Sequence, residues 1–218
     1  MKISMQAILF DLDGTLLDTG PDMGCALNRL LKHHGRPVIS YDRIRPKVSH
    51  GATALLQLGL GADSADPEFE AFRQQFLNFY EQDLCSRTQL FGGMSEVLAH
   101  LDEQKLPWGV VTNKPEYLTL PLLEAFGLLA RSACVVGGDT LSQRKPHPAP
   151  LLHGCLLANV EPGRCIYIGD AKGDIDAGRR AGMKTLIAAF GYLSKDDEPE
   201  KWGADGLIRN PRDILHWV

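Results

Sequence analysis

Aspartates follow two separate apolar runs of this chain. One run ends at Phe10 and leads into Asp11, with Asp13 two residues later, and the run "CIYIG" leads into Asp170, with Asp174 four residues later. Buried carboxylates are costly unless a positive group meets them. A divalent cation relieves their repulsion, and magnesium suits an all-oxygen site with few protein ligands. The sequence therefore predicts a magnesium site at the ends of two strands.

A simpler use exists for each aspartate taken alone. An aspartate beside a glycine is commonly a helix N-cap or a turn residue, and Asp13 or Asp176 in isolation fits that use. Two acidic clusters that each end a buried strand fit it poorly, because open parallel sheets bind ligands beyond the carboxyl ends of their strands. Asp11 and Asp13 should point the same way if strand geometry persists that far, because side chains alternate along a strand.

A third strand end offers groups that bind anions. The run "WGVV" leads into Thr112 and Asn113, which precede a helix expected to begin near Pro115. Helix N-termini carry unpaired NH groups that bind phosphate. Lys145, which Pro146 holds in place, offers an ammonium group. Each feature alone is weak, since a lone lysine is usually solvent-exposed.

Short apolar runs alternate with helical patterns over most of the chain. This alternation favours a parallel sheet covered by helices on both faces, the α/β class. We expect strands at 7–10, 108–112, 133–138, 164–169 and 184–189.

The first two strands are separated by almost 100 residues, far more than one crossover helix needs. The excess is mostly helical in pattern, with helices expected at about 21–34 and 66–84. In the second of these, phenylalanines recur at helical spacing, which favours core packing over a cofactor role. We therefore expect a helical insert over residues 16–88, and the remaining segments, 1–15 and 89–218, to form the main domain.

Composition excludes several classes of protein. The net charge of −4 gives no reason to expect nucleic acid binding, which needs a concentrated basic face. The five cysteines are odd in number and contain no CxxC pair, which favours reduced thiols and a cytoplasmic location. The N-terminal stretch lacks the pattern of a signal peptide, and no apolar run has the length of a membrane helix.

Four short motifs occur in a characteristic order: "DLDGT", "VVTN", "RKP" and "GDAKGD". This ordered set closely resembles the haloacid dehalogenase superfamily over nearly the whole chain. The resemblance implies a doubly wound, Rossmann-like sheet as the core, and a small helical cap inserted after the first strand, which fits the insert inferred from spacing.

The resemblance also implies roles for individual residues. Asp11 would be the nucleophile that forms an aspartyl phosphate, and Asp13 would be the general acid and then the general base. The Asp11 side chain, the Asp13 backbone carbonyl and Asp170 would bind magnesium, with Asp174 in a supporting position. The phosphoryl oxygens would be held by Thr112, the NH of Asn113 and Lys145.

The chain most resembles phosphatases that act on small phosphate monoesters. The stretches "FDLDGTLLDT", "TNKP" and "VSHGATALL" resemble phosphoglycolate phosphatases, while "LLDTGPD", "WGVVTNKP" and "WGAD" also resemble N-acetylmuramic acid 6-phosphate phosphatases. We expect the loop at Ser49, His50 and Gly51 to determine substrate specificity, although a plain surface role for His50 fits as well. Sugar phosphomutases and a non-catalytic binding protein are rival functions. We expect a monomer or a homodimer.

Overall fold

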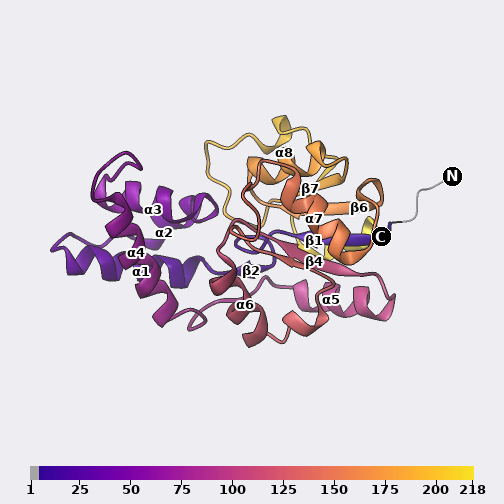
Figure 1. Ribbon diagram of the computed structural model, residues 1–218, viewed down its shortest axis with the longest axis horizontal. Coiled ribbons are helices and arrows are strands. Elements are labelled where there is room, and N and C mark those ends of the chain that lie inside the picture. The colour runs from indigo at the N-terminus through magenta and orange to yellow at the C-terminus, as the bar shows by residue number, and fades with distance from the viewer. Residues whose placement is uncertain (1–4) are drawn as a thin grey trace.

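The computed structural model describes residues 5–218 (Figure 1). Part of the argument about a signal peptide rests on residues 1–4, which lie outside the described residues. Over residues 5–218 the structure contains no helix with the length and apolar character needed to cross a membrane.

A six-stranded parallel sheet forms the larger part of the molecule. Its order is β5-β4-β1-β6-β7-β8, so β1 lies at the centre between two strands that come much later in the chain. The five predicted strands are present, although β5 is shorter than expected, and the sixth strand, β8, was not predicted. The strands are β1 (Ala7–Phe10), β4 (Trp108–Val111), β5 (Val135–Val136), β6 (Cys165–Gly169), β7 (Lys184–Ala188) and β8 (Gly206–Ile208).

Helices cover both faces of this sheet (Figure 1). Ile8 and Phe10 of β1 belong to the apolar cluster formed with α5 (Met94–Glu103) and α6 (Glu116–Ala125). The alternate residues Ala7 and Leu9 pack in the cluster with α7 (Ala149–Ala158) and α8 (Lys172–Arg180). Every β1 side chain is therefore buried, as its uninterrupted apolar sequence predicts. The predicted α/β class and its double winding are confirmed.

A group of helices lies at one end of the molecule, on the left in Figure 1. Most members of a second apolar cluster, among them Leu27, Leu56 and Phe76, come from these helices, and Leu118 and Tyr192 join it from the main domain. The predicted division into an insert, 16–88, and a main domain stays a proposal. The elements are α1 (Gly20–His33), α2 (Tyr41–Ile44), a 3₁₀ helix (Arg45–His50), α3 (Gly51–Leu60) and α4 (Phe69–Gln82).

Two chain segments connect the helical group to the sheet, and they pair with each other. The strands β2 (Leu17–Asp18) and β3 (Gln89–Leu90) form a two-stranded antiparallel ribbon. Next to it the buried carboxylate of Asp22 accepts hydrogen bonds from the backbone NH of Arg87, at 3.0 Å, and from the NH and hydroxyl of Thr88, at 2.8 and 2.7 Å. Asp22 therefore fastens the exit from the insert to the entry.

We expect Asp22→Ala to lower the free energy of unfolding by about 2 to 4 kcal/mol, because it leaves buried donors without an acceptor. Urea unfolding measured by circular dichroism checks this value. Asp42→Ala is the matched control, because Asp42 is exposed on α2 and its loss is expected to change stability by less than about 0.5 kcal/mol. Equal stability of the two variants would contradict the structural role of Asp22.

Candidate active site

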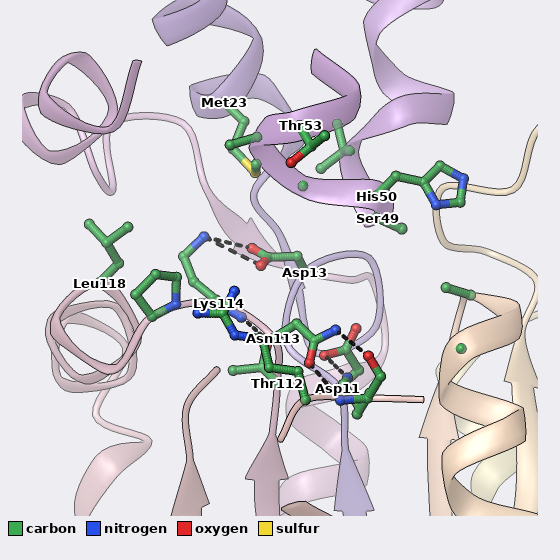
Figure 2. Close-up of a pocket in the computed structure, with 18 of the residues that line it drawn as sticks. Asp11, Asp13, Met23, Ser49, His50, Thr53, Thr112, Asn113, Lys114 and Leu118 are labelled. Atoms are coloured by element: carbon green, nitrogen blue, oxygen red, sulfur yellow. Dashed lines mark hydrogen bonds and ion pairs between the residues drawn. The ribbon is translucent and has the colours of Figure 1, made fainter. Parts of the chain in front are cut away.

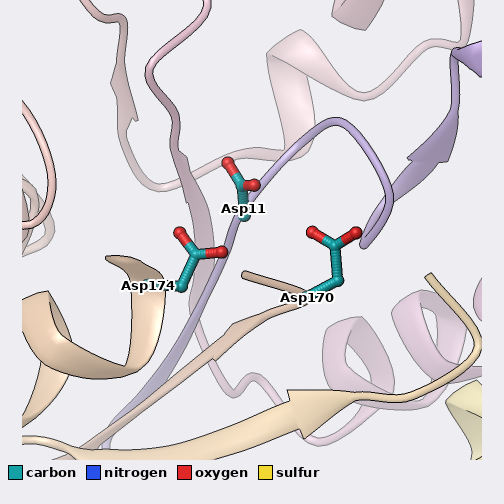
Figure 3. A group of neighbouring side chains, drawn as sticks. All are labelled: Asp11, Asp170 and Asp174. Atoms are coloured by element: carbon teal, nitrogen blue, oxygen red, sulfur yellow. The ribbon is translucent and has the colours of Figure 1, made fainter. Parts of the chain in front are cut away.

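Three aspartates converge at the carboxyl ends of β1 and β6 (Figure 3). One carboxylate oxygen from each of Asp11, Asp170 and Asp174 lies within 4.8 Å of the others. Parallel pairing of β1 with β6 places Phe10 beside Ile168, so the residues that follow each strand meet at one edge. Asp174 joins them from the first turn of α8. The structure thus brings together the two acidic clusters that the sequence keeps far apart.

Lys145 lies against this cluster and is almost completely buried. Its Nζ donates hydrogen bonds to Asp11 Oδ1, Asp174 Oδ1 and Tyr167 Oη, each at 2.7 Å. The backbone NH and carbonyl of Lys145 are both held by the side-chain amide of Asn113, at 3.0 Å. Asn113 therefore positions Lys145, a contribution that the sequence analysis did not foresee. Lys145 also links Asp174 to Asp11 through its ammonium group.

Asp13 has a different set of partners from Asp11. Its carboxylate accepts a hydrogen bond from Thr19 Oγ1, at 2.6 Å. It also accepts hydrogen bonds from Lys114 Nζ, at 3.0 and 3.3 Å (Figure 2). Strand β1 ends at Phe10, so the condition under which Asp11 and Asp13 would point the same way is not met. The two neighbouring carboxylates are therefore each paired with a different lysine.

Sequence reasoning missed Lys114. It is 7% exposed and follows Thr112 and Asn113 at the end of β4, and its backbone NH donates to Thr112 Oγ1 at 3.2 Å. A usable signal was present, because Lys114 precedes Pro115 just as Lys145 precedes Pro146. The same pattern that marked one lysine as a candidate could have marked the other.

Asp170 is held by the main domain and by the helical group together. Its Oδ2 accepts hydrogen bonds from the backbone NH of Tyr192, at 2.8 Å, and from Ser49 Oγ, at 2.5 Å. Gly14 passes so close that an added Cβ would lie 2.1 Å from Asp170 Oδ2, and its φ of +87° suits glycine. The glycine after Asp13 is thus required by this approach as well as by the turn.

The charges of the site fit a divalent cation. Asp11, Asp13, Asp170 and Asp174 face two lysines, Lys114 and Lys145, so the fully ionised group carries two negative charges in excess. Asp170 forms no ion pair with a described residue, and its buried Oδ1 has no hydrogen-bond partner there. Hard oxygen ligands with uncompensated charge are what Mg²⁺ binds. The residues present therefore fit the predicted metal.

The pKa values of two carboxyl groups are consistent with this excess of negative charge. Burial raises the pKa of Asp170 to about 8, and the nearby carboxylates of Asp11 and Asp174 add to the shift. Burial also raises the pKa of Asp11 to about 7, although the ammonium group of Lys145 opposes this change. Without a cation, the folded protein therefore holds protons on this cluster that an unfolded chain releases near pH 4.

We expect the metal-free protein to become less stable as pH rises from 5.5 to 8.5. A carboxyl group whose pKa is higher in the folded state stabilises that state at low pH, and this contribution is lost as pH rises through the folded pKa. Urea unfolding in a chelator checks this, with Asp170→Asn as the control that should weaken the dependence. The same slope in both proteins would contradict it. Saturating Mg²⁺ should restore stability at pH 8.5.

A cavity of about 420 Å³ lies between this cluster and the helical group (Figure 2). Thr112 and Asn113 line it from the main domain. His50 and Gly51 line it from the insert, with Gly51 at a φ of +69° where α3 begins. The remaining lining is partly apolar and partly cationic, and includes Met23, Val48, Phe76, Leu77, Leu118, Arg73, Arg144 and Lys172. The candidate residues predicted from sequence therefore meet around one cavity, except Asp170, which lies beside it in the aspartate cluster.

Comparison with known proteins agrees with this geometry. Residues 8–188 match the family model described as haloacid dehalogenase-like hydrolase. The chain is 44% identical over 206 residues to the phosphoglycolate phosphatase of Xanthomonas campestris pv. campestris, covering 94% of this chain and 93% of the relative. It is 38% identical over 214 residues to the N-acetylmuramic acid 6-phosphate phosphatase of Pseudomonas aeruginosa, covering 98% of this chain and 95% of the relative.

A solved structure with the same fold also shows clear sequence similarity. The crystal structure described as a predicted phosphoglycolate phosphatase from Haemophilus somnus superimposes with a TM-score of 0.86 and is 30% identical, covering 98% of this chain and 97% of the other. The motifs, the sheet order, the aspartate cluster and these relatives agree. The chain belongs to the haloacid dehalogenase-like hydrolase family.

Proposed function

We propose that this protein is a magnesium-dependent phosphatase that hydrolyses a small phosphate monoester through an aspartyl phosphate. The observation that carries the proposal is the division of the site at the end of β1. Asp11 lies in the three-aspartate cluster with Lys145, while Asp13 lies beside it with Lys114. A nucleophile and a proton donor are thus held next to each other in different surroundings, which is how two carboxyl groups acquire different tasks.

The reaction then has two steps carried out by these residues. A carboxylate oxygen of Asp11 forms a bond to phosphorus while the bond from phosphorus to the ester oxygen breaks, and Asp13 donates a proton to that leaving oxygen. Asp13 next removes a proton from a water molecule that attacks the phosphorus, which releases inorganic phosphate and regenerates Asp11. Covalent catalysis of this kind divides one difficult displacement into two easier ones.

Other residues hold the phosphoryl group and the metal. Thr112, the NH of Asn113 and Lys145 are proposed to bind the phosphoryl oxygens. The Asp11 side chain, the Asp13 backbone carbonyl and Asp170 are proposed to bind Mg²⁺, with Asp174 supporting through Lys145. Bound magnesium would supply positive charge to the phosphoryl oxygens during transfer.

Two substrates are proposed, in line with two groups of relatives. The first is 2-phosphoglycolate. The second is N-acetylmuramic acid 6-phosphate, and the cavity favours it, because 420 Å³ lies within the range of about 300 to 1,000 Å³ that holds drug-sized ligands. A two-carbon acid needs much less room. The cationic side chains of Arg73 and Arg144 suit the carboxylate that both substrates carry.

The proposed setting is the cytoplasm, where a small phosphorylated metabolite is the substrate. The five cysteines are all free, and they include the buried Cys134, Cys155 and Cys165. Free thiols are typical of a reducing compartment. A monomer or a homodimer remains our proposal for the oligomeric state.

A phosphate-release screen tests the proposal. Purified protein with Mg²⁺ is assayed on p-nitrophenyl phosphate, 2-phosphoglycolate, N-acetylmuramic acid 6-phosphate and other sugar phosphates, with a chelator-treated sample as the control. We expect magnesium-dependent release from at least one alkyl phosphate. No release from any ester would overturn the proposal, and interconversion of sugar phosphate isomers without free phosphate would identify a phosphomutase instead.

A further inference from the structure

The two buried lysines of the site are divided between its two halves. Lys145 serves the metal-binding side, whereas Lys114 contacts only the carboxylate of Asp13 among the four site aspartates. We propose that Lys114 is a positioning residue that fixes the carboxylate of Asp13 for proton transfer to the leaving group and links it to helix α4 of the insert. This inference rests on the proposed function.

The contacts of Lys114 leave its ammonium group little freedom. The side chain is 4% exposed, and Nζ lies 3.0 Å from one oxygen of Asp13 and 3.3 Å from the other. Thr19, the other partner of Asp13, is a neutral donor that contacts a single oxygen. A charge-assisted contact to both oxygens defines the orientation of the whole carboxylate. Lys114 is therefore the group that fixes the rotation of Asp13.

Lys114 also has a partner in the helical insert. Its Nζ lies 4.4 Å from the centre of the Tyr80 ring, and Tyr80 is a fully buried residue of α4. The ammonium group lies over the ring of Tyr80, so the ring face of this side chain meets the charge. A desolvated cation over an aromatic ring is attracted by the negative face of the ring. The position of α4 thus affects the orientation of the Asp13 carboxylate through the ammonium group of Lys114.

The cavity explains why this link is useful. Asp13, Lys114 and Tyr80 all line the space between the main domain and the insert. The leaving group of a bound ester has to occupy this space, because the phosphoryl group is held at the aspartate cluster. Lys114 contacts both the Asp13 carboxylate and the Tyr80 ring of α4. The Asp13 carboxylate is therefore oriented toward the ester oxygen only when α4 packs against Lys114.

The inference predicts a dependence on the leaving group. An alkyl alkoxide needs a proton as it departs, and a positioned general acid supplies about 10²- to 10⁴-fold in rate. The p-nitrophenolate ion is a stable anion and departs without that proton. Loss of Lys114 should therefore damage the hydrolysis of alkyl phosphates much more than that of p-nitrophenyl phosphate.

The experiment compares kcat/KM for the best alkyl phosphate of the screen with kcat/KM for p-nitrophenyl phosphate at saturating Mg²⁺. We expect Lys114→Met to lose about 10²-fold or more with the alkyl ester and less than about 10-fold with the aryl ester. Lys114→Gln, which keeps a hydrogen-bond donor, is measured alongside in case the methionine variant misfolds. Lys201→Met is the control, because Lys201 is exposed and pairs only with Glu198 on the surface.

A second pair of variants tests the link to the insert. Tyr80→Leu removes the ring and should show a smaller loss of the same selective kind, whereas Tyr80→Phe keeps the ring and should retain the ratio of the wild type. Melting temperatures verify that each variant is folded. Unchanged selectivity in Tyr80→Leu would overturn the link to α4.

The outcomes separate this inference from the proposed function. Equal losses with both esters in a folded Lys114 variant would overturn the positioning role while leaving the phosphatase proposal intact. A wild-type protein that releases no phosphate from either ester would overturn both. A selective loss with the alkyl ester supports the role of Lys114.

Discussion

Asp11→Asn is expected to abolish magnesium-dependent phosphate release, with a loss of at least about 10⁴-fold in kcat, as for removal of other catalytic nucleophiles. The amide oxygen of asparagine is a poor nucleophile, and it cannot form the acyl phosphate that the second step hydrolyses. The fold should survive, because asparagine has nearly the same shape and is uncharged at a buried position where burial raises the pKa of Asp11 to about 7. Turnover assays together with urea unfolding check both parts.

Asp196→Asn provides the control for this substitution. Asp196 is exposed in the charged loop after β7, so the same chemical change is expected to leave turnover and stability unaltered. An Asp11→Asn protein with wild-type turnover would contradict the proposed nucleophile. A variant that is inactive because it is unfolded would contradict the expected tolerance of the fold.

Asp170→Ala is expected to lower magnesium affinity and activity by more than about 100-fold. Loss of a residue that only supports a metal ligand typically costs about 10- to 100-fold, and Asp170 is a proposed direct ligand. It has no cation partner among the described residues, and its Oδ1 is buried without a hydrogen bond. Titration of activity with Mg²⁺ measures the shift. Calorimetric titration of Mg²⁺ without substrate measures the loss of binding independently of turnover.

Asp176→Ala is the matched control from the same motif. Asp176 lies six positions later in α8, where it pairs with Lys172 instead of joining the cluster. We expect its Mg²⁺ dependence to match that of the wild type. An unchanged dependence in Asp170→Ala would remove Asp170 from the metal site.

Local sequence patterns predict the main features of the fold. Uninterrupted apolar runs identify the central strands, because a strand buried on both faces has no position for a polar residue. The long spacing after the first strand predicts a helical insert. Two acidic runs locate the candidate site, since Asp11 and Asp170 each directly follow a strand of one sheet. These are local patterns, readable without knowledge of the partner segments.

The short elements needed the tertiary structure. The ribbon of β2 with β3 has only two residues in each strand, and its pairing joins segments on opposite sides of the insert. The strand β8 is also short and contains a glycine, Gly206. Elements of this length are defined by their neighbours, because so few residues carry no periodic pattern of their own.

The pairing of charges was likewise decided by the tertiary structure. Lys114 and Asp13 are 101 residues apart in sequence, and Ser49 is 121 residues from Asp170. Contacts between residues so far apart in sequence depend on how the strand ends and the helical group are arranged in space. The sequence therefore identified the acidic groups of the site and Lys145 but not Lys114, and the pairing of each lysine with its aspartate followed from the tertiary structure.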